Sequence, residues 1–154
     1  MVEKVIIMEL LDKQLDFTGC KIALICDGRI LTILRDDKPT IPWPNLWELP
    51  GGGREGDESP FECAAREVYE ELGIHLDEDC LLWSKIYPSV IFKDKQSVFM
   101  VGQLRQEQFD NITFGNEGQA YKLMLIEEFL KSKQAVPQLQ GRLRDYLEEN
   151  YDKT

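Results

Sequence analysis

The chain has very little histidine: His75 is the only one among 154 residues. Catalytic triads, His-rich zinc sites and HExxH metalloproteases all need imidazole side chains, so the sequence argues against each of these classes. His75 follows a predicted helix and precedes an acidic loop, and we interpret it as a surface residue. A metal bound by this chain would then be held by oxygen ligands, which favours Mg²⁺ or Mn²⁺.

Long apolar runs and CxxC pairs are also lacking. No uninterrupted apolar segment approaches the length of a membrane span, and the first five residues show no basic leader or small-residue cleavage site. The four cysteines are interpreted as free thiols rather than a disulfide, three of them in apolar surroundings, as is usual in a reducing compartment. They are Cys20, Cys26, Cys63 and Cys80. We therefore expect a cytoplasmic protein without a membrane segment.

Positive charge is scarce as well. Lys and Arg number 18 against 28 Asp and Glu, which gives a formal net charge of −10. This balance opposes unaided binding to nucleic acid or anionic lipid, because both require a basic surface. A small phosphorylated ligand remains compatible with it, since a metal ion can neutralise the ligand's charge. The length and the 43% hydrophobic content fit one folded domain, 1–154.

Apolar, β-branched segments alternate with helical patterns along the chain. Strands are predicted at 5–11, 21–26, 30–34, 46–49, 81–86, 97–104 and 122–125. Asp27-Gly28-Arg29 is predicted as a hairpin turn, 36–45 as a proline-rich loop and 50–53 as a glycine-rich loop. A last amphipathic helix is expected over about 137–150. The pattern predicts an α/β (α+β) sandwich, monomeric or dimeric, in which strand 5–11 is an edge or capping strand or pairs across a dimer.

The best-marked helix is predicted over 60–72. Ser59 occupies the N-cap position, Pro60 the first helical position, and Glu62 completes a capping box. Gly73 ends the helix in the usual way. The helix has one apolar stripe, which we expect to pack against a sheet. Its members are Phe61, Ala64, Ala65, Val68 and Leu72.

Three glutamates occupy the outer face of this helix. Glu67, Glu70 and Glu71 are spaced i, i+3, i+4, so their side chains share one face. Like charges at this spacing destabilise a helix by roughly 0.2–0.5 kcal/mol per pair, and negative charge near its C-terminus adds to this cost. A divalent cation would turn the repulsion into attraction. Taken alone, the same pattern also fits a solvated acidic face.

The residues around the glutamates favour a ligand site. Gly51, Gly52 and Gly53 follow a strand, and glycines there allow the backbone to approach a ligand or an ion closely. A plain tight turn is the alternative. Arg66 can hold Glu67 by a charge-assisted hydrogen bond or reach back to Glu58, or it can be an ordinary surface arginine.

Together these residues read Gly52-x5-Glu58-x7-Arg66-Glu67-Val68-x-Glu70-Glu71-x-Gly73-Ile74. This pattern resembles the Nudix box of the Nudix hydrolase superfamily at every defined position. The segment Trp47-x-Leu49-Pro50-Gly51-Gly52 is similar to the strand and loop that lead into the box in this family. The resemblance implies a Nudix-type α/β/α sandwich with a mixed β-sheet.

The resemblance also implies Mg²⁺-dependent hydrolysis of a pyrophosphate linkage in a nucleoside diphosphate derivative, with Mn²⁺ as an alternative metal. By position in the motif, Glu67, Glu70 and Glu71 are the expected metal ligands, and the Gly51 carbonyl is a further candidate. Gly115-Asn116-Glu117-Gly118-Gln119 resembles a loop of the MutT-type enzymes, which makes Glu117 a candidate general base. Glu107 is the alternative, and a plain loop residue is a third interpretation of Glu117.

The substrate is less well defined by the sequence. Gly52, Gly53, Trp43 and Gln138 are the candidate substrate-binding residues, Gln138 because it stands near the position of a base-recognising asparagine in sanitisers of oxidised guanine nucleotides. Trp47, Tyr87 and Phe92 can add stacking surface or be packing residues. A nucleoside triphosphate cleaved to monophosphate and pyrophosphate is favoured. ADP-ribose, a dinucleoside polyphosphate, or nucleotide sensing without turnover are the alternatives.

Overall fold

The computed structural model describes residues 9–150. Most of the strand predicted at 5–11 lies outside the described residues. At its described end, Glu9 and Leu10 have helical backbone and Leu11 lies in a turn, so the prediction of a strand is wrong there.

The centre of the molecule is a seven-stranded mixed sheet. Its strands are β1 (Gly19–Cys26), β2 (Arg29–Leu34), β3 (Trp47–Glu48), β4 (Gly51–Gly53), β5 (Leu81–Pro88), β6 (Gln96–Gln103) and β7 (Ala120–Leu125). The main path runs β3-β2-β1-β6-β5, with β4 paired to β1 and β7 paired to β2. Only β1 and β6 run parallel among the strand pairs of the described chain, which makes the sheet mixed, as predicted.

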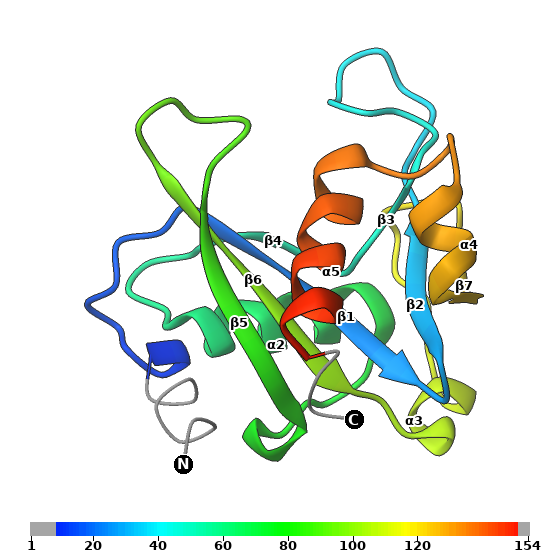
Figure 1. Ribbon diagram of the computed structural model, residues 1–154, viewed down its shortest axis with the longest axis horizontal. Coiled ribbons are helices and arrows are strands. Elements are labelled where there is room, and N and C mark those ends of the chain that lie inside the picture. The colour runs from blue at the N-terminus through cyan, green and yellow to red at the C-terminus, as the bar shows by residue number, and fades with distance from the viewer. Residues whose placement is uncertain (1–8, 151–154) are drawn as a thin grey trace.

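Helices cover both faces of this sheet (Figure 1). They are α2 (Pro60–Leu72), the 3₁₀ turn η1 (Glu78–Cys80), α3 (Gln106–Asp110), α4 (Ile126–Lys131) and α5 (Pro137–Asn150). The apolar residues of α2 pack on one face, and those of α4 and α5 pack on the other. The short helices α3 and α4 were not predicted from the sequence. Within residues 9–150, no helix combines the length and the apolar character needed to cross a bilayer.

Local signals fix the ends of α2 as predicted. The Glu62 amide donates to Ser59 Oγ at 3.2 Å, and the Ser59 amide donates to Glu62 Oε1 at 2.9 Å, which completes the capping box. Gly73 ends the helix with φ of 68°, and its amide donates to the Tyr69 carbonyl. The ends of α2 are therefore fixed by its caps, and burial of its apolar residues turns the glutamates to the opposite face.

The β1–β2 hairpin turns at Asp27 and Gly28, which have φ of 49° and 75°. Two consecutive left-handed residues match the twist of an antiparallel pair, which is why Asp-Gly suits this turn. Arg29 already pairs with Cys26 and belongs to β2, so the turn is one residue shorter than predicted.

The glycine run after β3 is a strand and not the loop that the sequence predicted. Gly51, Gly52 and Gly53 pair antiparallel with Lys21, Cys20 and Gly19. Gly51 has φ of 140°, and a Cβ atom there would overlap the Cys20 carbonyl oxygen. Glycine is required here because two backbones approach closely, a long-range contact that no local pattern contains.

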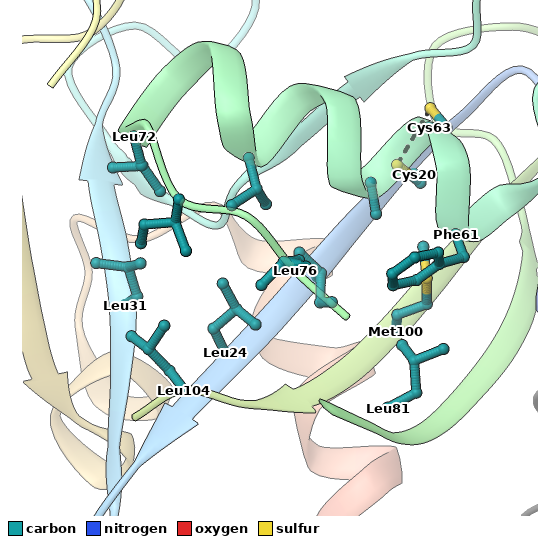
Figure 2. Packing of buried hydrophobic residues seen from close by; sticks show 14 of the residues in the cluster. Cys20, Leu24, Leu31, Phe61, Cys63, Leu72, Leu76, Leu81, Met100 and Leu104 are labelled. Carbon is teal, nitrogen blue, oxygen red and sulfur yellow. Dashed lines mark hydrogen bonds between the residues drawn. The ribbon is translucent and has the colours of Figure 1, made fainter. Parts of the chain in front are cut away.

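The core beneath α2 is closely packed with aliphatic and aromatic side chains (Figure 2). Leu24 of β1 and Met100 of β6 meet Phe61 and Leu72 of α2 in this layer. All four cysteines are free thiols, as expected. Cys20 Sγ lies 3.3 Å from Cys63 Sγ, which ties β1 to α2 directly below the glycine strand.

Candidate functional site

A cavity of about 400 Å³ lies beside β4 and the C-terminal half of α2. The proline-rich loop 36–45 and the β5–β6 loop project from the same end of the molecule (Figure 1), and both contribute to its wall. The wall also includes the start of β1 and the first turns of α5. The lining residues that the sequence pointed to are Trp43, Gly51, Gly52, Gly53, Glu67, Glu71, Phe92, Glu117 and Gln138.

Two of the three box glutamates line this cavity. The Gly51 amide donates to Glu71 Oε1 at 3.0 Å, which fixes this carboxyl against β4. Burial raises the pKa of Glu71 to about 8, against the opposing effects of Lys21 and this hydrogen bond. Burial also raises the pKa of Glu67, although Arg66 acts in the opposite direction. At both carboxylates, burial thus outweighs the positive charge of the nearby Lys21 and Arg66.

Glu70 is placed differently from this pair. Its side chain is exposed, does not line the cavity, and accepts a hydrogen bond from Arg66 Nη1 at 3.2 Å. The same Arg66 nitrogen donates to Glu67 Oε1 at 3.0 Å. Arg66 therefore bonds to both Glu67 and Glu70, two of the three carboxylates that are predicted to bind one metal ion.

Arg66 makes both of the contacts that were weighed from the sequence. It donates to Glu58 from Nε at 2.7 Å and from Nη2 at 3.1 Å, in addition to its bond to Glu67. Nη2 also donates to the Gly53 carbonyl at 2.7 Å, which anchors the end of β4 to α2. The hydrogen bonds to Glu58 raise the pKa of Arg66 further above its usual range. Burial acts in the opposite direction but has the smaller effect. Arg66 is thus a positioning residue for the box.

The donor set fits a hard divalent cation, although its side chains are not gathered into a ready-made cluster. Within residues 9–150, no group of three His, Cys, Asp or Glu side chains is arranged to hold a metal ion. Two carboxylates that burial disfavours as anions nevertheless line the cavity beside the backbone of β4. A cation of the Mg²⁺ type requires oxygen ligands of this kind and would stabilise both carboxylates as anions. Glu67 and Glu71 would hold it. The Gly51 carbonyl on β4 and Glu70 on α2 are the further candidate ligands.

The sequence did not single out a buried ion cluster beneath this site. Lys21 Nζ donates to Glu48 Oε1 at 2.6 Å and to the Gly51 carbonyl at 3.2 Å, while Arg35 Nη1 donates to Glu48 Oε2 at 3.0 Å. Burial would lower the pKa of Lys21, but the carboxylates of Glu48 and Glu71 more than offset this and raise it. The sequence signal that could have pointed to this cluster was Glu48, a charged residue at a buried position of the short strand β3.

Gly52 has a specific steric role beside Glu67. A Cβ atom at Gly52 would lie 2.6 Å from the Glu67 carboxyl carbon, whereas a Cβ at Gly53 would meet nothing within 4 Å. We expect Gly52→Ala to displace the Glu67 carboxylate and to lower turnover on the order of 10- to 100-fold, since small misplacements of catalytic groups have effects of this size. Steady-state hydrolysis assays test this, with Gly53→Ala as the matched control. Equal activity in both variants would contradict the role given to Gly52.

Some of the remaining predicted residues line the cavity, and the others lie outside it. Glu117 lies in the cavity wall, while Glu107 lies on α3 outside it, 3.3 Å from Arg105. Trp47 does not line the cavity and is covered by Lys122 Nζ at 4.7 Å from its ring. Tyr87 is also a packing residue and donates to Asp145 Oδ2. Of the four aromatic candidates, only Trp43 and Phe92 face the cavity.

Comparison with known proteins adds a family to this geometry. The family described as "NUDIX domain" matches residues 21–146. A MutT-like protein of Streptomyces ambofaciens is 51% identical over 53 residues, which cover 34% of this chain and 30% of that protein. Diphosphoinositol polyphosphate phosphohydrolase 2 of Rattus norvegicus is 32% identical over 91 residues, which cover 58% and 48%. The crystal structure of a MutT protein from Methanosarcina mazei has a TM-score of 0.69 at 20% identity, covering 89% of this chain and 97% of that one.

The match to the family extends well beyond the box. It runs from β1 through most of α5, and so includes every strand and helix that contributes to the cavity. The chain spans less than half the length of these two curated relatives. The structural neighbour has the same fold over nearly its whole length, with a mixed sheet between helices. The box residues, the fold and the extent of this match show that the chain belongs to the Nudix hydrolase family.

Proposed function

We propose that this chain is a Mg²⁺-dependent pyrophosphohydrolase that cleaves a nucleoside triphosphate to a monophosphate and pyrophosphate. The observation that carries the proposal is the placement of Glu67 and Glu71 in the wall of a nucleotide-sized cavity, beside the backbone of β4. A divalent cation bound there would neutralise phosphate oxygens and favour deprotonation of the attacking water. The curated names of the relatives concern those proteins and do not define the substrate of this one.

The chain's own residues have distinct roles in this proposal. Glu67 and Glu71 would hold the cation, which would place the phosphate chain beside β4. Arg66 holds Glu67 in place through its bonds to Glu58 and the Gly53 carbonyl. Lys21 carries a positive charge beneath the Gly51 carbonyl and remains charged because Glu48 and Glu71 stabilise it. These groups position the pyrophosphate linkage relative to water, which is the main task of an enzyme in phosphoryl transfer.

The charge of the cavity supports a nucleotide over a densely phosphorylated inositol. Its wall holds three basic side chains, Lys21, Arg35 and Arg142, against the four acidic side chains of Glu48, Glu67, Glu71 and Glu117. Lys21 and Arg35 are already paired with Glu48. A substrate with many phosphates needs several free cations, whereas a nucleotide needs them only around its phosphate chain.

Product analysis with purified protein and Mg²⁺ tests the proposal. The panel contains nucleoside triphosphates with different bases, ADP-ribose, a dinucleoside polyphosphate and a diphosphoinositol polyphosphate. Release of pyrophosphate and a monophosphate from one triphosphate, absent without metal, is the expected result. Turnover of another member alone would overturn the choice of substrate. Nucleotide binding without any hydrolysis would favour the sensing alternative.

Glu117 is our candidate for the general base because it lines the cavity. We expect Glu117→Gln to lower kcat on the order of 100-fold, since the amide cannot accept a proton from the attacking water. Glu107→Gln is the matched control and should retain normal activity, because Glu107 lies outside the cavity on α3. A steady-state comparison of kcat for the two variants distinguishes them. Similar activities would remove Glu117 from the mechanism.

A further inference from the structure

Arg142 on α5 is a buried cation that the box and its metal do not explain. Its relative exposure is 8%, and it lines the cavity at the side formed by α5 and the β5–β6 loop. No carboxylate of residues 9–150 lies within ion-pair distance of it. The other two cations in the cavity wall, Lys21 and Arg35, both contact Glu48. Buried arginine is usually paired, so an arginine without a carboxylate partner indicates a ligand that is absent here.

The guanidinium is held firmly while most of its donors stay free. Nη2 donates to the Pro88 carbonyl at 3.2 Å, and Cζ lies 4.7 Å from the centre of the Tyr87 ring. Tyr87 is fixed in turn, because its hydroxyl donates to Asp145 Oδ2 at 2.7 Å. Nε and Nη1 of Arg142 have no hydrogen-bond partner among the described residues. The guanidinium is therefore oriented in advance by Tyr87 and Pro88 and not by a counter-ion.

The unpaired nitrogens of Arg142 are not sealed inside the protein. Ser97 Oγ is the one fully enclosed side-chain nitrogen or oxygen in residues 9–150 that lacks a hydrogen-bond partner. Nε and Nη1 of Arg142 are thus not fully enclosed, and Arg142 is among the residues that line the cavity. Ser97 pairs with Tyr87 across β5 and β6, and its enclosed hydroxyl is a second unpaired polar group close to the same part of the cavity wall.

The surroundings of these donors suit a flat heterocycle better than a phosphate. The neighbouring wall is largely apolar, with Ser89 and Gln138 as polar members, and its apolar residues are Val90, Ile91, Phe92, Val136, Leu139 and Trp43. Val90, Ile91 and Phe92 are each more than half exposed, which is unusual for such side chains without a ligand. Aromatic and aliphatic walls stack on a base, and a fixed guanidinium then donates to acceptors on its edge.

We propose that Arg142 recognises the acceptor edge of a 6-oxopurine, so that this site selects guanine-type over adenine-type nucleotides. Guanine presents O6 and N7, two adjacent acceptors that match a planar donor pair made of Nη1 or Nε together with the second hydrogen of Nη2, which the bond to Pro88 leaves free. Adenine presents an amino group at the same place, which would oppose the arginine donors. The inference rests on the proposed function for the position of the phosphate chain, but the base preference itself is measurable without turnover.

The test compares GTP, ATP and 7-deaza-GTP as substrates, and GMP and AMP as ligands in calorimetry. For the unmodified protein, kcat/KM for GTP should exceed that for ATP on the order of 10- to 100-fold. 7-Deaza-GTP lacks the N7 acceptor and should lose part of this advantage. Arg142→Gln should abolish the preference and the effect of the 7-deaza substitution together, while Arg142→Lys, which keeps the charge but not the paired donors, should give an intermediate preference.

Arg144→Gln is the matched control, because Arg144 lies on the same helix, donates to the Leu130 carbonyl and does not line the cavity. It should keep the base preference. Equal losses for GTP and ATP in Arg142→Gln would indicate a phosphate contact or a structural role and overturn the inference, as would equal binding of GMP and AMP by the unmodified protein. Tighter binding of GMP without hydrolysis of any nucleotide would overturn the proposed function and leave the role of Arg142 supported.

Discussion

We expect the Glu71→Gln variant to fold normally and to lose nucleotide hydrolysis on the order of 100-fold or more. The amide keeps the shape of the carboxyl and can still accept the hydrogen bond from the Gly51 amide. It cannot supply the negative charge that a divalent cation needs, so binding of the metal and positioning of the phosphate chain are lost together. The measurement is pyrophosphate release in the presence of saturating Mg²⁺.

Stability measurements separate this loss from misfolding. The pKa of about 8 for Glu71 in the folded protein lies above its usual value of 4.5, so folding favours the protonated form. The metal-free protein should therefore lose stability as pH rises between these two values, and Glu71→Gln should reduce that loss. Mg²⁺ should raise the melting temperature of the unmodified protein more than that of the variant. Near-normal turnover in Glu71→Gln would remove Glu71 from the proposed site.

Replacing Arg66 with methionine is expected to destabilise the fold by roughly 2–4 kcal/mol, since breaking a largely buried ion pair leaves carboxylates without compensation. The side chains of Arg66, Glu58 and Glu67 are only 20%, 17% and 16% exposed. Arg66 holds the pKa of Glu58 below its usual value, although burial acts in the opposite direction. Urea unfolding monitored by circular dichroism measures the loss.

The exposed ion pair between Arg105 and Glu107 provides the comparison for this prediction. Their side chains are 66% and 73% exposed, so Arg105→Gln should change stability by less than about 1 kcal/mol. Adding Glu58→Gln to Arg66→Met should recover part of the lost stability, because it removes one of the carboxylates left unpaired. If Arg66→Met and Arg105→Gln had similar stabilities, Arg66 would not hold the box together as its contacts indicate.

The sequence predicted best what depends on neighbouring residues. The caps of α2 at Ser59 and Gly73 lie within the helix's own segment, and the structure confirms them. The span of α5, 137–150, also follows from its local pattern of apolar residues. The prediction failed for β4, since Gly51–Gly53 become a strand only by pairing with β1, about thirty positions earlier. The short helices α3 and α4 carry too few residues for a periodic pattern to emerge.

The candidate site shows the same contrast between residues predicted from local patterns and residues that become distinctive only through tertiary contacts. Glu67, Glu70 and Glu71 were predicted together from their spacing, and the structure places Glu67 and Glu71, but not Glu70, in the cavity wall. Glu48 and Arg142 were not singled out, because each resembles an ordinary charged residue within its own segment. Glu48 becomes distinctive only through contact with Lys21 and Arg35, and Arg142 only through its lack of a carboxylate partner. Such properties arise from tertiary packing and have no local pattern.

The parallel pairing of β1 with β6 affects the order in which the molecule can assemble. β1 aligns with β6 from Gly19 opposite Ser97 to Ile25 opposite Gln103, so the middle of the sheet joins segments far apart along the chain. Closing such a long loop is slow compared with forming the β1–β2 hairpin. During synthesis on the ribosome, β1 therefore cannot pair with β6 until more than half of the chain has been made. The cavity is completed later still, because α5 supplies part of its wall.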